Sequence, residues 1–381
     1  MKILILNWRD RKNPKAGGAE VVTEEIAARW VEWGHQVTLF TASFPDALPE
    51  ETINGVQIIR RGSQATVHWK AFRHYRKHWR GYFDVVIDEI NTIPFFTPLY
   101  VKNGERRFSY FNQLCREIWF YEAPVPKLLA VFGYVLEPLY LRPYRKLPAL
   151  TISDSTKQDL NKLKIWDVQV FPIATELLPL DTLPAKAEAG RFIFVGRQVP
   201  SKRVHHIIEA IALVKPHYPQ IKLDIVGAGD DKYIDKLKKQ TALLGLEEQI
   251  IFHGRVPQAR KHQLMQEANA ILVTSVREGW GLIVTEANML GTPAIVYNVP
   301  GLRDSVRHYQ TGLITNNNNP ATLANLMLTL IEQPELQIRL ALNSLSWAKE
   351  LNWQRTAQHI IKYLEVDATY LLNKSETISS I

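Results

Sequence analysis

Short apolar runs that alternate with amphipathic stretches are the feature that most constrains this fold. Near the N-terminus, Lys2–Asn7 has the length and apolar content of a buried strand, and Ala19–Trp33 has helical spacing and is followed by Gly34. Further strands are predicted at Val37–Thr41, Asp84–Ile87, Ser109–Phe111 and Ala149–Ser153. Because strands that alternate with helices form parallel sheets, the first part of the chain is expected to be an α/β domain.

The same alternation starts again after residues 175–190, which contain Pro179 and Pro184, lack periodicity and are typical of a linker. Beyond it, strands are predicted at Phe192–Val195, Lys222–Val226, Ile250–Phe252, Ala270–Thr274 and Ala294–Tyr297, and helices at Val204–Val214, Tyr233–Leu244, His262–Glu267 and from about Leu282. The length of 381 residues suffices for two domains of ordinary size. We therefore predict two doubly wound α/β domains, with ligands at the carboxyl ends of the strands, in the cleft between the domains.

Composition excludes several other classes of protein. Apolar residues make up 46% and charged residues 22%, which are values of compact globular chains and not of disordered, collagen-like or coiled-coil ones. The single cysteine, Cys115, cannot form an internal disulfide, and this favours a reducing compartment. The best apolar run, Leu128–Leu136, stops at Glu137-Pro138, short of the roughly 20 residues that span a bilayer. We expect a cytoplasmic protein without a membrane span or an export signal.

The whole chain has a net charge of +8, and most of this positive charge lies in one segment of its first half. Between Arg60 and Arg80, seven Lys and Arg side chains stand among aromatic residues without any Asp or Glu. The segment is compatible with a solvated helix face or with an anionic membrane surface, where aromatic residues suit the headgroup layer. No nucleic-acid-binding motif accompanies it, so nucleic acid is not expected as a partner.

The run from Thr274 to Glu286 follows a predicted strand and leads into a helix. Gly279 and Gly281 stand just before the helix, so that free N–H groups near Gly281, Leu282 and Ile283 coincide with the positive end of the helix dipole. This arrangement favours a phosphate. Glu278 would lie on the loop, and Glu286 about one turn into the helix, where it could reach a ribose of the same ligand.

Cations follow an earlier strand at the matching place. Arg197 and Lys202 could supply the counter-charge of a diphosphate. The alternative is that both are ordinary surface cations that bind no ligand. Gly227-Ala228-Gly229 is a lone GxG and does not support a dinucleotide cofactor. Asp230-Asp231 fits a solvated turn better than a metal site. We expect neither a cofactor nor a required metal.

Several of these segments, taken together, resemble a known family. The run from Arg277 to Glu286 resembles the E-x7-E motif of retaining glycosyltransferases of family 4, whose GT-B fold has two Rossmann-like domains facing across a cleft. Further matching segments are Gly17-Gly18-Ala19-Glu20, Phe194-Val195-Gly196-Arg197 with Lys202, Ile225 to Gly229, Phe252 to Val256, and Leu290-Gly291-Thr292-Pro293 with Gly301. The resemblance implies transfer of a sugar from a UDP- or GDP-linked donor to a sugar, lipid-linked or glycan acceptor, with retention at the anomeric carbon.

The resemblance also implies roles for residues. Glu278 would hold hydroxyls of the donor sugar as a catalytic residue, Glu286 the ribose, and Arg197 with Lys202 the diphosphate. The other implied donor-binding positions are Gly17, Gly18, Gly254, Arg255, Gly279, Trp280, Gly281, Leu282 and Ile283. The leaving diphosphate would itself help to deprotonate the acceptor, so the site needs charge stabilisation more than a strong base. The expected division is residues 1–175 on the acceptor side, 176–353 around the nucleotide sugar, and 354–381 as a helix that returns to the first domain.

One position departs from the family pattern. Members often carry a histidine after a middle strand of the first domain, where this chain has Asn112, which can donate a hydrogen bond to a sugar but cannot shuttle protons. Asn112 is therefore a candidate catalytic residue, and Glu89 and Asn91 are candidates on the acceptor side. A non-catalytic relative that binds or stabilises another enzyme, and a sugar-nucleotide epimerase of similar fold, stay open as alternatives.

Overall fold

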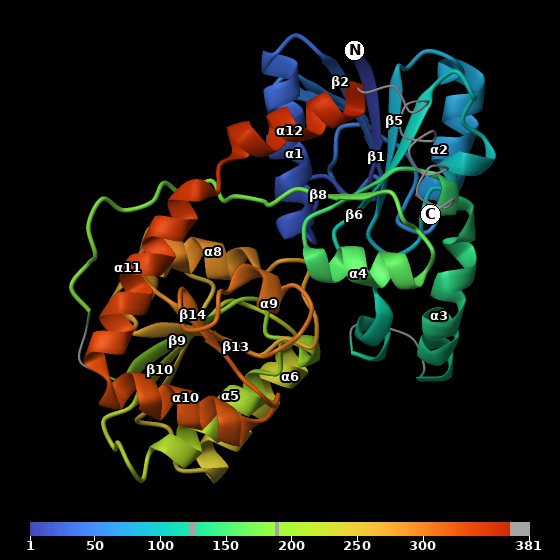
Figure 1. Ribbon diagram of the computed structural model, residues 1–381. Coiled ribbons are helices and arrows are strands. Elements are labelled where there is room, and N and C mark those ends of the chain that lie inside the picture. Colours follow the sequence, from blue (N-terminus) through green and yellow to red (C-terminus); the bar gives the residue numbers. More distant parts are fainter. Residues whose placement is uncertain (122–126, 187–189, 366–381) are drawn as a thin grey trace, which may run out of the picture. The chain divides into compact units, whose positions relative to one another are not determined.

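The computed structural model describes residues 1–121, 127–186 and 190–365 (Figure 1). Their contacts divide the chain into two compact units. The first unit comprises Met1–Cys115, Val135–Ile173 and the chain from Asn352 onward, and the second comprises Arg116–Tyr134 and Ala174–Leu351. Each unit contains one sheet with helices packed against it, as expected for two Rossmann-like domains.

The first unit is built on an eight-stranded sheet of order β3-β4-β2-β1-β5-β6-β7-β8, in which only the β3–β4 pair is antiparallel. Its strands are β1 (Lys2–Leu6), β2 (Gln36–Thr41), β3 (Glu50–Ile53), β4 (Val56–Arg60), β5 (Val85–Ile90), β6 (Arg106–Phe111), β7 (Ala149–Thr151) and β8 (Val168–Val170). Its helices are α1 (Gly18–Glu32), α2 (Val67–His74), α4 (Asp154–Lys162) and α12 (Trp353–Glu365), while α3 (Lys127–Tyr140) crosses the boundary between the units. A five-residue π-helix, Tyr75–Trp79, continues α2.

The second unit is built on a six-stranded, fully parallel sheet of order β11-β10-β9-β12-β13-β14. Its strands are β9 (Arg191–Val195), β10 (Lys222–Val226), β11 (Ile250–Gly254), β12 (Ala270–Val273), β13 (Ala294–Val296) and β14 (Gly312–Ile314). Its helices are α5 (Val204–Val214), α6 (Asp231–Leu243), α7 (Gln258–Glu267), α8 (Leu282–Met289), α9 (Leu302–Ser305), α10 (Pro320–Glu332) and α11 (Pro334–Glu350). Each strand and helix predicted for this region is confirmed, and the structure adds β14, α9, α10 and α11.

Two glycines determine how closely the loops after β9 and β10 can approach. A Cβ atom on Gly227 would lie 2.1 Å from the carbonyl oxygen of Gly196, and one on Gly229 would lie 2.0 Å from that of Gln198. With glycine at both positions, the two loops pair as if the strands continued, and the N–H of Gln198 donates to the carbonyl of Ala228 at 2.9 Å. The lone GxG is thus a packing feature, and it places Arg197 beside the end of β10.

The C-terminal helix α12 packs within the first unit, against α1. The indole of Trp30 donates to the carbonyl of Ala357 at 3.0 Å, and the hydroxyl of Thr356 donates to the carbonyl of Pro172 at 2.6 Å. A chain segment more than 300 residues away in sequence therefore completes the core of the N-terminal sheet.

Every helix among the described residues is too short or too polar to cross a membrane.

Candidate functional site

Lys202 and Glu278, two residues of the predicted donor site, meet in the second unit. Lys202 ends the short 3-10 helix Pro200–Lys202, and the hydroxyl of Thr274 donates to the carbonyl of Lys202 at 2.8 Å, which ties the loops after β9 and β12 together. The ammonium group of Lys202 forms an ion pair with Glu278. The hydroxyl of Ser275 donates to the same carboxylate oxygen at 2.7 Å. The sequence therefore brings two predicted site residues into direct contact across 76 positions.

The loop after Glu278 is shaped by glycines. A Cβ atom on Gly301, which has a φ of +82°, would lie 2.2 Å from the carbonyl oxygen of Glu278. The N–H of Glu278 in turn donates to the carbonyl of Pro300 at 3.1 Å. Gly281 has a φ of +90° and immediately precedes α8, so the loop enters the helix through a left-handed conformation. The helix start predicted at Leu282 is confirmed, and its first N–H groups are available to an anion.

Trp280 differs from its neighbours on this loop because its side chain is buried. Its indole N–H donates to the hydroxyl of Thr285 at 2.9 Å, and its ring packs near that of Trp347. Only the backbone of Trp280 is therefore left for a ligand. Gly279 lies on the loop before α8, and Ile283 is the second residue of the helix, with its side chain packed against the core.

The residues expected around the nucleoside lie on other elements of the second unit, in α8 and at the end of β11. Glu286, in α8, is ion-paired with Lys261 of α7 at 2.6 Å. Gly254 ends β11 with a φ of +64°, and Arg255 follows it with an exposed side chain. The preceding residue, His253, contacts the buried carboxylate of Asp224 at 2.7 Å, which fixes the end of β11.

Asp230 is a helix cap. Its carboxylate accepts from the N–H of Tyr233 at 2.8 Å, at the start of α6. Within the described ranges no three His, Cys, Asp or Glu side chains gather as a metal site would require.

One contact of this site has no counterpart in the sequence analysis. Glu117, in the 3-10 helix Arg116–Phe120, forms an ion pair with Arg277 at 2.7 Å, directly beside Glu278. The side chain of Arg277 is nearly buried. No local pattern announces the contact, because the two residues are 160 positions apart.

In the first unit, the glycines expected near the phosphates begin α1. Gly17 precedes the helix and Gly18 is its first residue. The N–H of Gly17 donates to Glu20 at 2.6 Å, and the other carboxylate oxygen of Glu20 pairs with Arg9 at 2.9 Å. Glu20 thus caps the N-terminal end of α1.

The three candidates of the first unit form one hydrogen-bonded network at the carboxyl ends of β5 and β6. The amide nitrogen of Asn112 donates to Glu89 at 3.0 Å and to Asn91 at 3.2 Å. The amide of Asn91 donates in turn to Asn7, after β1, at 3.1 Å. Since the amide nitrogen of Asn112 is fully used, its oxygen is the group left for a ligand. In this arrangement Asn112 would meet a ligand as a hydrogen-bond acceptor, and its role in catalysis stays a prediction.

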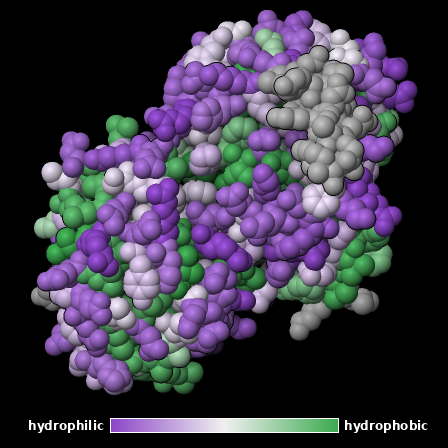
Figure 2. Space-filling model, viewed as in Figure 1, coloured by the Kyte–Doolittle hydropathy of each residue, from purple (hydrophilic) through white to green (hydrophobic). Residues whose placement is uncertain are grey.

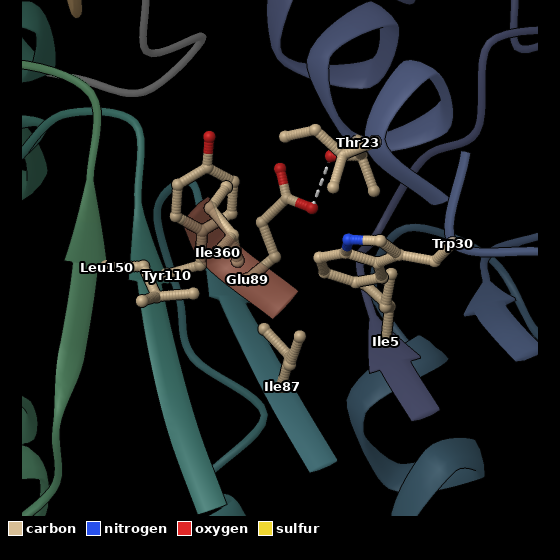
Figure 3. A pocket seen from close by; sticks show the side chains of 9 residues that line it. Ile5, Thr23, Trp30, Ile87, Glu89, Tyr110, Leu150 and Ile360 are labelled. Atoms are coloured by element: carbon tan, nitrogen blue, oxygen red, sulfur yellow. Dashed lines mark hydrogen bonds between the residues drawn. The ribbon is translucent and has the colours of Figure 1, made fainter. Parts of the chain in front are cut away.

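Glu89 borders a small cavity of about 20 Å³ in the core of the first unit (Figure 3). The cavity is lined by Ile5, Thr23, Ile26, Trp30, Ile87, Glu89, Tyr110, Leu150 and Ile360. Burial, with a smaller contribution from the charge of Glu20, raises the pKa of Glu89 to about 8, while hydrogen bonds from Thr23, Asn112 and Asn7 oppose the shift. The protonated form of Glu89 is therefore favoured beside Asn112.

The basic segment divides into a buried and an exposed part. The prediction that Arg60 belongs to an exposed basic surface is wrong. Its side chain is fully buried and pairs with Asp10 at 2.7 Å and with Glu51 at 2.9 Å. The exposed cations on α2 and the π-helix are Lys70, Arg73, Arg76 and Lys77, and Arg80 directly follows the π-helix. The exposed ring of Trp69 lies among them.

An exposed apolar patch covers α3 (Figure 2). Its members are Val131, Phe132, Val135 and Leu139, whose spacing places them on neighbouring positions of the helix surface. The segment from Phe108 to Tyr144 is rich in aromatic residues, and only part of them belong to the core: Tyr110, Phe111 and Tyr144 are buried, and Phe132 is 60% exposed.

Comparisons with known proteins agree with this geometry. Residues 182–347 match the family model described as glycosyl transferases group 1, and residues 16–108 match the model of glycosyltransferase family 4. Phosphatidyl-myo-inositol mannosyltransferase of Mycobacterium leprae is 24% identical over 93% of this chain and 94% of its own length. D-inositol 3-phosphate glycosyltransferase of Corynebacterium glutamicum is 29% identical, but the match spans only 44% of this chain and 41% of that protein.

Solved structures share the fold at low identity. Sucrose-phosphate synthase from Thermosynechococcus elongatus has a TM-score of 0.77 with 18% identity, covering 95% of this chain and 98% of its own. HepE of Anabaena, solved in complex with UDP-glucose, has a TM-score of 0.70 with 18% identity, covering 96% and 99%. The two sheets, the E-x7-E loop before α8 and both family models lead to one assignment: the chain belongs to glycosyltransferase family 4 and has the GT-B fold.

Proposed function

We propose that this protein is a retaining glycosyltransferase that moves a sugar from a nucleotide diphosphate donor to an acceptor without a metal ion. The observation that carries the proposal is the cluster of Lys202, Ser275 and Glu278 beside the N-terminus of α8. A cation, a carboxylate and a row of free N–H groups are the complement of a sugar diphosphate, whose phosphates are anionic and whose sugar carries hydroxyl donors.

In the proposed reaction, Arg197, Lys202 and the N–H groups at Gly281 and Leu282 stabilise the negative charge that develops on the departing diphosphate. These groups replace the charge that a divalent metal would otherwise supply. Glu278 accepts hydrogen bonds from hydroxyls of the donor sugar, and Glu286 accepts from the ribose. The acceptor hydroxyl loses its proton to the leaving diphosphate on the same face of the sugar, which gives retention of configuration.

Binding of donor changes the partners of Lys202 in this scheme. Without donor, Lys202 neutralises Glu278. When a diphosphate binds, Lys202 turns to the phosphates and releases the carboxylate of Glu278 for the sugar hydroxyls. A single ion pair is thereby exchanged for two ligand contacts, so neither charge is left unpaired in either state.

We further propose that the acceptor is lipid-linked and that the protein meets it at the cytoplasmic face of a membrane. The exposed cations of α2 and the π-helix, with Trp69 among them, have the composition that favours an anionic lipid surface. The apolar patch on α3 adds a second exposed surface of the kind that suits a lipid or its headgroup region. The similarity to a phosphatidyl-myo-inositol mannosyltransferase supports a lipid acceptor.

The alternative of a non-catalytic relative rests on Asn112, which stands where many relatives have a histidine. Calorimetric titration, without added metal, against UDP- and GDP-linked glucose, mannose, galactose and N-acetylglucosamine tests the main proposal. We expect one donor to bind at micromolar concentration and to be lost in the Arg197→Ala/Lys202→Ala double variant. Binding of a donor without any hydrolysis or transfer would favour the non-catalytic relative.

A further inference from the structure

The hydrogen-bond geometry around Glu89 favours a protonated carboxyl group. Its side chain is enclosed at the end of β5, with one carboxyl oxygen, Oε2, 2.6 Å from the hydroxyl of Thr23 (Figure 3). The other oxygen, Oε1, lies 3.0 Å from the amide nitrogen of Asn112. Among the described residues no cation pairs with this carboxyl group. A buried, unpaired carboxylate is strongly disfavoured.

Thr23 has a single hydroxyl hydrogen but two close oxygen neighbours. Its Oγ1 lies 3.0 Å from the carbonyl of Ala19, one helical turn earlier, as well as 2.6 Å from Glu89. If Glu89 were ionised, one of these two oxygen pairs would have no hydrogen between its atoms. A proton on Glu89 Oε2 satisfies both, because Glu89 then donates to Thr23 and Thr23 donates to Ala19.

The same proton fixes the orientation of Asn112. Once the carboxyl hydrogen is directed at Thr23, Glu89 Oε1 can only accept, so Asn112 must turn its NH₂ group toward Glu89. The second hydrogen of that group goes to Asn91. The carbonyl oxygen of Asn112 is buried and has no hydrogen-bond partner among the described residues, an unfavourable state unless a ligand supplies a donor.

We propose that Glu89 acts in its protonated form as a positioning residue, which locks Asn112 so that its carbonyl oxygen accepts a hydrogen bond from a substrate hydroxyl. The ligand class is thus a polyhydroxylated one, such as the transferred sugar or a sugar-like acceptor. The proposal rests on the proposed glycosyltransferase function for its ligand, but not for the protonation of Glu89.

The charged and titratable groups that face Glu89 favour the neutral form. From α1, Glu20 brings a second negative charge, which Arg9 partly neutralises. From β6, Tyr110 lines the same cavity, and burial raises its pKa well above the ordinary value, so it stays a neutral phenol. The remaining side chains that line the cavity from β1, β5, β7, α1 and α12 carry no charge.

The first test is a carbon-13 NMR titration of glutamate carboxyl groups in the full-length protein, with Glu89 assigned by the signal lost in Glu89→Gln. We expect a signal that is protonated at pH 7 and moves only at alkaline pH. A Glu89 signal that titrates with the exposed glutamates near 4.5 overturns the proposal. Because this readout needs no substrate, it decides the protonation even if no sugar transfer is ever found.

Glu105 provides a matched control in the same unit. It is also buried, but it receives only donors, from the hydroxyl of Tyr75 and the N–H groups of Gly81 and Phe83. An amide can replace a protonated carboxyl but not an all-acceptor carboxylate. At pH 6 we expect Glu105→Gln to unfold at clearly lower urea concentration than Glu89→Gln; the opposite order contradicts the proposal.

The second test separates positioning from folding by kinetics. With the donor found by calorimetry, Glu89→Leu should lose at least about tenfold in turnover while donor binding is kept, and Glu89→Gln should restore most of the loss. In an Asn112→Ala background, Glu89→Leu should cost little more, because Glu89 acts through Asn112. Equal losses in the Gln and Leu variants, or fully additive losses with Asn112→Ala, contradict a protonated positioning residue. A wild type that binds donor but transfers nothing refutes the proposed function instead.

Discussion

Lys202 and Glu278 form an ion pair in which the hydroxyl of Ser275 also donates to the carboxylate, at 2.7 Å. The pair joins the loop after β9 to the loop after β12, so the cation proposed for the phosphates and the carboxylate proposed for the sugar are held by each other before a donor arrives. Each is only partly exposed, at 21% and 17% of the side chain. Removing either partner therefore changes the charge that a donor encounters.

Replacing Glu278 by Ala should abolish sugar transfer and leave nucleotide binding intact. Lys202 loses its internal partner in this variant, so its positive charge becomes more available to a diphosphate. We expect turnover to fall by at least about a hundredfold, with the affinity for the free nucleoside diphosphate unchanged or higher by calorimetry. Wild-type turnover in this variant would refute the role of Glu278.

Lys202→Ala should have the opposite pattern, with weakened diphosphate binding. The remaining carboxylate of Glu278 then faces the phosphates without a neighbouring cation and repels them. We expect a loss of at least about tenfold in affinity for the nucleoside diphosphate, or about 1.4 kcal/mol. An affinity equal to that of the wild type would mean that Lys202 serves only to hold Glu278.

Gly301 should tolerate no side chain, because a Cβ atom there would meet the carbonyl of Glu278 at 2.2 Å. Gly245 is the matched control, since its φ of +61° is also left-handed but no atom lies within 4 Å of the added carbon. We expect Gly245→Ala to lower the free energy of unfolding by about 1 kcal/mol and to leave donor binding unchanged. Gly301→Ala should cost more than about 2 kcal/mol and weaken donor binding. Urea denaturation and calorimetry measure both, and equal effects of the two substitutions would be contrary to this account.

Much of this fold follows from the sequence because its signals are local. The second unit is clearest, since its strands are apolar on both faces and its helices are short and well bounded, as at Asn319, whose side chain caps α10. The β3–β4 hairpin is absent from the prediction although Asn54-Gly55 marks it. Both residues have positive φ, the conformation of a tight hairpin turn. The Asn54-Gly55 pair therefore predicts the hairpin from sequence alone, even though the mixed polarity of Glu50–Ile53 is not typical of a strand.

Contacts between distant residues could not be predicted in the same way. The charge pattern alone places Arg60 with the exposed cations, because its partner Asp10 lies 50 positions earlier and leaves no local trace. The ion pair of Glu117 with Arg277 is equally invisible. The orientation of Asn112 depends on one proton shared between Glu89 and Thr23, which no residue pattern encodes.

The burial of Arg60 leads to a prediction about stability that separates it from its basic neighbours. Arg60→Met leaves Asp10 as an unpaired carboxylate in the core, since both side chains are fully buried. Breaking such a pair costs about 3–5 kcal/mol in the free energy of unfolding. Arg73→Met, at an exposed position, should change stability by less than about 0.5 kcal/mol. Urea denaturation of the two variants checks the difference, and similar midpoints would mean that the buried pair contributes little.

Replacing Arg73, Arg76, Lys77 and Arg80 by Ser should reduce binding to vesicles that contain anionic lipid. All four are exposed, three on α2 and the π-helix and Arg80 directly after it, and each cation near such a surface contributes about 1 kcal/mol. The control replaces Lys232, Lys236, Lys238 and Lys239, which are exposed on α6, so that the net charge changes equally at another place. Co-sedimentation with the vesicles should fall in the first variant only. Equal losses would indicate non-specific attraction to net charge, and unchanged binding in both would remove the membrane proposal.

The raised pKa of Glu89 predicts that the protein loses stability as pH rises. In the unfolded chain the group releases its proton near 4.5, but in the folded protein only near 8, so between these values the folded state binds more protons. Stability must then fall with increasing pH, by up to about 1.4 kcal/mol per pH unit from this one group, and the contribution is complete below 4.5 and lost above 8. Glu89→Gln removes the titration, so the difference in unfolding free energy between the variant and the wild type should grow in favour of the variant from pH 5 to pH 8. A difference that stays constant over this interval would show that Glu89 titrates alike in both states, as an ionised carboxylate would.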